Sequence, residues 1–182
     1  MVITNVRFDW LFIWEARAAQ EGGPKKFSAC CLIPKEDKKQ VKEIEKAIEN
    51  AKQQGIAKGM YTEAQTKAKD FRMCLRDGDE EVAAEQRPAH YKGHYFFNCS
   101  SDAQPGIIGP DGKPILNPDS FYSGCYGHVD VNFYPFNKKG GKGVAAGLNN
   151  IMKAQDGDRL DGRQKAEDAF ADLMPQSDDD LQ

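Results

Sequence analysis

The sequence predicts a mainly β fold, a small barrel of five or six strands with one inserted helix. Several stretches alternate apolar and polar residues with a period of two, which is typical of strands with one buried face. One long stretch, Lys38 to Lys52, instead repeats apolar residues every three or four positions, as an amphipathic helix does. Strands and helices do not alternate regularly along the chain. That order favours a barrel over a doubly wound parallel sheet.

The first two strands are predicted to form a hairpin. Alternate positions of the first carry apolar residues, so we expect one buried face made of Val6, Phe8, Trp10, Phe12 and Trp14. Leu11 and Ile13 make the second half of this strand apolar on both faces. After the loop at residues 21–24, residues 26–33 form the second strand, which ends at Pro34 because proline has no backbone N–H to donate.

The inserted helix is expected to begin after Asp37, whose carboxylate can accept from the free N–H groups of the first turn. Gly55 is expected to end it. Residues 56–74 suggest a short lysine-rich helix, and residues 75–88 receive no assignment.

The remaining strands are predicted at residues 93–99, 106–108, 122–135 and 144–152. A strong turn at residues 110–114 follows the second of these, and a loop at residues 137–143 separates the last two. We therefore expect one domain over residues 1–155. Residues 156–182 are expected to be a linker and a disordered acidic tail.

Composition indicates the cellular compartment in which the protein is expected. The chain has 182 residues, of which 40% are hydrophobic, and an apolar run such as Leu11 to Trp14 is far below the roughly 20 residues that span a bilayer. No secretory signal pattern opens the sequence. The five cysteines are odd in number and include the adjacent pair Cys30 and Cys31, which disfavours a disulfide framework. A cytoplasmic protein with reduced thiols, away from membranes, is expected.

The C-terminal segment differs in charge from the rest of the chain. From Gln164 onward one lysine faces six acidic residues, which are Glu167, Asp168, Asp172, Asp178, Asp179 and Asp180. This segment has a net charge of −5, whereas the rest of the chain has +2. An acidic tail beside a mildly cationic body suggests that the body binds a polyanion, with which the tail competes, or that the tail recruits a partner. A solubilising tail is the alternative.

No catalytic motif supports an enzyme. The sequence lacks a Gly-x-Ser-x-Gly elbow, a His-Glu-x-x-His motif and a dinucleotide fingerprint. His90 and His94 have the spacing of helical metal ligands, but Pro88 and Gly93 disfavour a helix there. We expect no reaction, no cofactor and no metal.

Aromatic residues interleaved with cations and glycines give the strongest functional signal. Bases of single-stranded nucleic acid stack on aromatic rings while lysine and arginine neutralise the phosphates. The cations predicted to contact phosphate are Arg72, Arg76, Lys92, Lys138, Lys139 and Lys142. The residues predicted to stack on bases are Tyr95, Tyr122, Tyr126 and Tyr134, because a tyrosine hydroxyl tolerates water. For each, a place in the core or a solvated hairpin tip is the alternative.

With these stretches in view, the chain resembles the tailed-phage family of single-stranded-DNA-binding proteins. The resemblance spans most of the chain and rests on residues 27–35, 75–79, 93–98, 121–126, 143–150 and 166–170. It implies an OB-fold barrel, DNA binding without sequence preference, and an acidic tail that restrains binding. Proteins of this function often end in an aromatic residue, whereas this chain ends in Leu181 and Gln182, so Phe170 or Leu181 would have to replace it.

These observations lead to one expected function and two alternatives. We expect a sequence-independent single-stranded-DNA-binding protein that acts in phage DNA replication or recombination in the cytoplasm of the bacterial host. Its tail competes for the DNA groove, so tail removal is expected to permit duplex binding, and replication proteins are the expected partners of the tail. The alternatives are a non-enzymatic phage interaction module whose barrel binds a protein, and an enzyme with an unfamiliar metal site.

Overall fold

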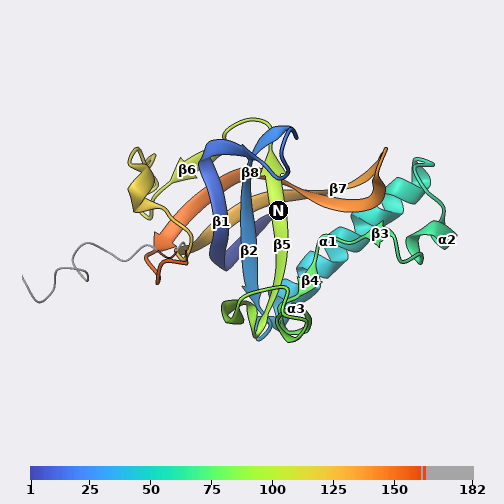
Figure 1. Cartoon of the computed structure of the whole chain (residues 1–182), viewed down its shortest axis with the longest axis horizontal. Helices are drawn as coiled ribbons and strands as arrows, with labels where there is room; N and C mark the ends of the chain where they lie inside the picture. The colour runs from blue at the N-terminus through green and yellow to red at the C-terminus, as the bar shows by residue number, and fades with distance from the viewer. Residues whose placement is uncertain (161, 163–182) are drawn as a thin grey trace, which may run out of the picture.

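The computed structural model describes residues 1–160 and 162, and its centre is a closed β-barrel (Figure 1). Five long strands form the wall in the spatial order β7, β1, β2, β5, β8. Their bounds are β1 (Val2–Ala18), β2 (Lys25–Pro34), β5 (His94–Ser101), β7 (Tyr126–Lys138) and β8 (Gly141–Gln155). Neighbouring wall strands are antiparallel except where β5 and β8 pair in parallel and close the barrel. The predicted mainly β barrel with an inserted helix is confirmed.

The barrel encloses one hydrophobic core to which all five wall strands contribute. Its fully buried side chains include Phe8, Ile13, Cys31, Phe97 and Val131. Phe8 packs edge-on against Phe121, with ring centroids 5.6 Å apart. All five cysteines are free thiols, and four of them are buried.

The first strand contains an irregularity that changes which of its residues face the core. Asp9 lies opposite Cys30 and Phe12 opposite Ser28, so β1 uses three steps where β2 uses two. Because an extra residue reverses the alternation of side chains, the core-facing residue beyond it is Ile13. Trp10 is 55% exposed. The predicted buried face is therefore right for Val6 and Phe8 but wrong for Trp10 and Phe12.

Helix α1 (Lys38–Ala57) lies along the outside of the barrel and packs against β7. Asp37 caps its first turn by accepting the backbone N–H of Gln40, as predicted. Gly55, however, is buried inside the helix, so the predicted end is wrong. A Cβ there would lie 2.2 Å from the Tyr61 hydroxyl and 2.8 Å from the Pro135 Cβ, so Gly55 permits close packing. The helix instead ends before Gly59, whose φ of +68° suits glycine.

Strands β7 and β8 continue past the barrel as a two-stranded arm beside α1 (Figure 1). Their pairing runs to Lys138 and Gly141, so the predicted loop at residues 137–143 is in fact a tight turn at residues 139–140. Short β3 (Phe71–Arg72) pairs in parallel with β8 in this arm, and the short helix α2 (Glu63–Thr66) precedes it.

A small cap covers part of the outer surface of β2 and β5. It consists of β4 (Arg76–Asp77), α3 (Gly78–Ala83) and the 3-10 turn η1 (Ala89–Tyr91). Tyr91 and Val82 of the cap pack on Cys30, Leu32 and Phe96, which form a second apolar cluster outside the barrel. Elsewhere, β6 (Gly106–Ile108) pairs with β8, and the turn η2 (Pro118–Ser120) precedes β7.

After β8 the chain folds back onto the barrel. The Tyr122 hydroxyl donates to an Asp156 carboxylate oxygen at 2.9 Å, and the Leu160 N–H donates to the Ser123 carbonyl at 2.9 Å. The division into residues 1–155 and 156–182 remains a prediction, because residue 161 and residues 163–182 lie outside the described part. Within the described part, no helix is long and apolar enough to cross a membrane.

Candidate nucleic-acid interface

Four cations gather at the tip of the β7–β8 arm. Lys138 and Lys139 are exposed at the turn, and Lys142 begins the return strand. The guanidinium of Arg72 donates to the Gly140 carbonyl at 3.1 Å, and Arg72 lies opposite Gly143 in the parallel pairing. The structure thus joins Arg72 to Lys138, Lys139 and Lys142, although about 70 residues separate them in sequence. We call these four residues the cationic tip.

Small and polar residues form a continuous row across the outside of the barrel wall. Ladder pairing places Phe12 opposite Ser28, Ser28 opposite Ser100, Ser100 opposite Gly147 and Gly147 opposite Asn132. Residues paired in a ladder share a face, and their neighbours in sequence, such as Ala29, Cys99 and Leu148, point into the core. This outer row therefore crosses all five wall strands. At about 4.8 Å per strand the row follows the curved wall for roughly 19 Å from Phe12 to Asn132.

The outer row meets the arm at Gly147 and Asn132. A Cβ at Gly147 would lie 2.6 Å from the Asn132 side-chain oxygen, so glycine keeps this part of the surface flat. Two residues further along β7 on the same face is Tyr134, which is 37% exposed and lies opposite Ala145. Tyr134 stands between the outer row and the cationic tip, as a base-stacking residue would need to.

At its other end the row meets Trp10 and Phe12, which the sequence reasoning missed. Their ring centroids are 6.3 Å apart, and the guanidinium carbon of Arg17 lies 4.7 Å from the centroid of the Phe12 ring. The only sequence signal for their outward orientation was the presence of Leu11 and Ile13 between them and after them. Apolar residues at both odd and even positions of one strand indicate that the buried face changes along it.

Tyr122 and Tyr126 lie together at the end of the barrel that holds residues 156–160. The Tyr122 ring has the Arg159 guanidinium carbon 3.9 Å from its centroid, and Arg7 lies 5.5 Å from the Tyr126 centroid. Burial, then the hydrogen bond to Asp156, raise the pKa of Tyr122. Both side chains are partly exposed. Their hydroxyl and ring contacts hold them against the barrel end, away from the cationic tip.

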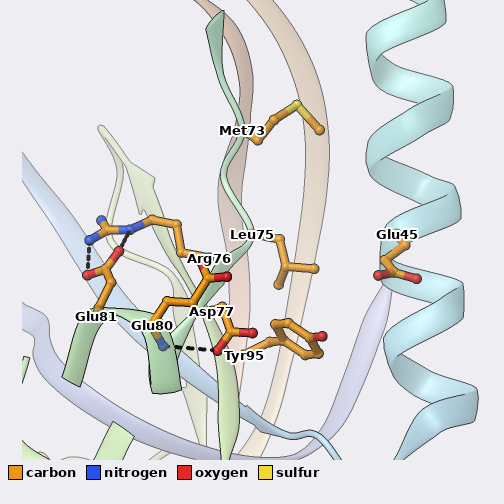
Figure 2. A pocket seen from close by; sticks show the side chains of 8 residues that line it. All are labelled: Glu45, Met73, Leu75, Arg76, Asp77, Glu80, Glu81 and Tyr95. Atoms are coloured by element: carbon orange, nitrogen blue, oxygen red, sulfur yellow. Dashed lines mark hydrogen bonds and ion pairs between the residues drawn. The ribbon is translucent and has the colours of Figure 1, made fainter. Parts of the chain in front are cut away.

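Arg76 and Tyr95 line a pocket of about 440 Å³ between the cap and α1 (Figure 2). Four carboxylates share this lining, those of Glu45, Asp77, Glu80 and Glu81. Both ends of the Arg76 guanidinium donate to Glu81, and this hydrogen bond lowers the pKa of Glu81. A phosphate would have to displace Glu81 and approach its neighbours. Arg76 and Tyr95 are thus in acidic surroundings, and their predicted DNA contacts stay predictions.

Lys92 is exposed beside the same cap. The backbone N–H of the next residue, Gly93, donates to Asp79 at 2.8 Å, and Lys92 contributes to a lowered pKa of Asp79, after the hydrogen bonds from Lys35 and Gly93. The structure therefore groups Lys92 with Arg76 and Tyr95, apart from the cationic tip.

The predicted tail residues Glu167, Asp168, Asp172, Asp178, Asp179 and Asp180 lie outside the described residues. The two histidines with ligand spacing are separately engaged: His90 Nε2 lies 3.0 Å from Asp9, and His94 Nδ1 lies 2.8 Å from the Lys92 carbonyl. Across residues 1–160 and 162, no three histidine, cysteine or acidic side chains cluster so that they could hold a metal.

A closed five-stranded barrel with an aromatic-edged outer row and a cationic arm defines a nucleic-acid-binding barrel of the OB type. The chain belongs to the family described as the ssDNA-binding protein of Enterobacter phage Enc34, whose sequence profile matches residues 1–181. It is 29% identical to protein p50 of Acyrthosiphon pisum secondary endosymbiont phage 1, over 98% of this chain and 96% of that protein.

Two solved structures show the same fold. The single-stranded DNA-binding protein from bacteriophage Enc34, in complex with ssDNA, matches with a TM-score of 0.75 and 20% identity over 87% of this chain and 88% of that one. The single-stranded DNA-binding protein gp2.5 of bacteriophage T7 matches with a TM-score of 0.58 and 13% identity over 97% and 96%. The predicted family resemblance is confirmed.

Proposed function

We propose that this protein binds single-stranded DNA without sequence preference during phage DNA replication or recombination and catalyses no reaction. Membership of the Enc34 family supports single-stranded DNA as the ligand. The observation that carries the proposal is the cationic tip, in which Arg72 is bonded to the turn between Lys139 and Gly141. The same family membership does not favour a barrel that binds only protein. The expected place of action is the cytoplasm of the bacterial host.

In this proposal the cationic tip and the outer row have different roles. Four cations on a narrow arm neutralise phosphates, and the glycines beside them let the DNA backbone come close. The outer row adds a track of mostly small side chains around the barrel wall, with Tyr134 at the arm as the first stacking residue. Because most residues of the row are small and uncharged, such as Ser28, Ser100 and Gly147, binding is governed by phosphate charge and stacking.

The acidic tail competes with DNA for these cations. A tethered segment has an effective concentration on the order of millimolar, so even millimolar affinity of the tail for the tip occupies it about half the time. Released from the tip, the same carboxylates are available to replication proteins. Without the tail, the cationic tip is open to duplex DNA as well.

A salt titration tests the proposal. The affinity of the full chain for a fluorescent oligo(dT) is measured by anisotropy between about 50 and 300 mM salt. Over this range the release of counterions from DNA dominates the change in affinity. We expect log K to fall linearly with log salt, at about −0.7 per neutralised phosphate. Affinity that does not change with salt would contradict the proposal. Retention of a host protein bait without affinity for oligo(dT) would revive the protein-binding alternative.

A further inference from the structure

Trp10, which is exposed, and Phe12, which is partly buried, form an aromatic pair at the β1 end of the outer row. Trp10 is 55% exposed, its ring is tilted 57° to that of Phe12, and Arg17 adds a cation over the Phe12 ring. A single exposed aromatic is ordinary on a protein surface. Here two aromatic rings lie side by side with a guanidinium over one of them, and such a surface suits a planar ligand.

The backbone of Trp10 has an unusual conformation that places this side chain outside. Its φ is +46°, in the left-handed region that bulky residues rarely adopt. Such a conformation is unfavourable and persists only where the surroundings impose it. Here the Trp10 backbone N–H donates to the Asp9 carboxylate at 2.8 Å. Asp9 therefore holds the irregularity of β1 that turns Trp10 away from the core.

Asp9 is itself fixed by the cap. Its side chain is 8% exposed, and its second oxygen accepts from the Tyr91 hydroxyl at 2.9 Å and lies 3.0 Å from His90 Nε2. Tyr91 is fully buried, and its hydroxyl also contacts the Cys30 thiol at 3.3 Å. Burial raises the pKa of Tyr91 and raises that of Cys30 to about 12, so both stay protonated. Arg87 lies over the Tyr91 ring, 5.3 Å from its centroid.

We propose that Trp10 and Phe12 are a stacking platform for an unpaired nucleobase and that Asp9, anchored by Tyr91 and His90, is the positioning residue of Trp10. This inference rests on the proposed single-stranded-DNA function. It extends the DNA path from the cationic tip along the outer row, around the barrel wall, to Phe12 and Trp10 of β1. The cap thereby gains a role in binding through Tyr91 and His90, which anchor Asp9.

A double-mutant cycle tests the positioning role with oligo(dT) as the probe. Trp10→Ala should weaken binding by about 5- to 150-fold, the range for one stacked base, and Trp10→Phe should restore most of it. Asp9→Ala should weaken binding to a similar degree in the natural chain but less than about twofold when Trp10→Ala is already present. Neither change should alter the salt slope, because stacking releases no counterions.

Two further measurements distinguish failure of this inference from failure of the proposed function. In a Trp14→Phe background, where Trp10 is the only tryptophan, oligo(dT) should quench the fluorescence, and Asp9→Asn should reduce that quenching without unfolding the chain. Independent, additive effects of Asp9→Ala and Trp10→Ala, or unchanged fluorescence on binding, would overturn the inference while leaving DNA binding intact. Absence of any salt-dependent binding by the natural chain would instead refute the proposed function.

Discussion

Individual glycines in this protein keep space open for neighbouring groups. Gly55 lies inside α1, where glycine ordinarily weakens a helix by about 1 kcal/mol relative to alanine. It is retained at a point where Tyr61 and Pro135 approach the helix backbone. Gly147 does the same on the outer row, where Asn132 fills the space of its missing side chain. At both positions the reason for glycine is the space around it, since neither needs a positive φ.

Gly55→Ala is expected to reverse the usual effect of this substitution in a helix. The new methyl group would overlap the Tyr61 hydroxyl and the Pro135 ring, so the free energy of unfolding should fall by roughly 1–3 kcal/mol. Urea denaturation measures this. Gln54→Ala, at an exposed position of the same helix, is the control and should change stability by less than about 0.5 kcal/mol. A more stable Gly55→Ala variant would show that α1 packs less closely on the arm.

At the scale of elements, the β7–β8 arm concentrates charge that the chain carries in separate segments. Strand β3 contributes Arg72, and the turn contributes the lysines. The arm projects beyond the barrel with α1 alongside it (Figure 1). A phosphate backbone can therefore reach the tip without meeting the carboxylates of the cap.

Replacing Lys138, Lys139 and Lys142 together by glutamine should weaken oligo(dT) binding and reduce the salt slope. Each lost phosphate contact removes about 0.7 from the slope, so the loss of three should lower it by roughly 2. The matched control is the triple glutamine variant of Lys38, Lys39 and Lys42, which are exposed at the far end of α1 and carry the same charge. Equal losses in the two variants would mean that overall charge, and no local site, governs binding.

The cap depends on an ion pair whose contribution should vary with pH. Arg76 donates to Glu81, whose pKa is thereby lowered from its ordinary value of 4.5. A lowered folded-state pKa contributes stability above the unfolded value, and this contribution is lost as the pH falls through the folded value. Glu81→Gln should therefore cost about 1 kcal/mol at neutral pH, as for a partly buried ion pair, and the cost should shrink as the pH falls below 4.5 toward pH 3.

Urea denaturation of Glu81→Gln and of the natural chain at both pH values checks this expectation. Glu80→Gln is the control, because Glu80 is exposed on the same short helix. It should show no comparable difference between neutral and acid pH. A Glu81→Gln deficit that persisted in acid would assign the effect to packing and not to charge.

Across the whole molecule, the charge of the C-terminal segment opposes that of the body. The segment from Gln164 has a net charge of −5 against +2 for the rest. This difference in charge affects DNA binding only if the C-terminal segment contacts the body. The last described residues lie beside the Tyr122 and Tyr126 end of the barrel, where the Leu160 N–H donates to the Ser123 carbonyl.

Deleting Gln164–Gln182 is expected to tighten oligo(dT) binding. If the tail occupies the tip about half the time, its removal should raise affinity by at least about twofold at low salt, and the gain should shrink as salt screens the competition. A variant with the six acidic residues changed to their amides keeps the tail length and should behave like the deletion. Unchanged affinity in both would return the tail to a solubilising role or a partner contact.

The sequence by itself determined the periodic features of this protein. Alternation identified the wall strands, three-and-four spacing identified α1, and Asp37 identified its start, because backbone geometry fixes these periods locally. The family resemblance and the charge division were also present in the residues. The lysines of the tip were predicted too, since a cation at a glycine turn needs no distant partner to be exposed.

Only the tertiary structure decided which of these residues lie together. Strand pairing joined Arg72 to the lysine turn and aligned Ser28, Ser100 and Gly147 in one row, because ladder register depends on distant segments. It also surrounded Arg76 with carboxylates and turned Trp10 outward through the bond to Asp9. Side-chain direction beyond an irregular residue is set by packing around it, and that information lies in contacts across the fold.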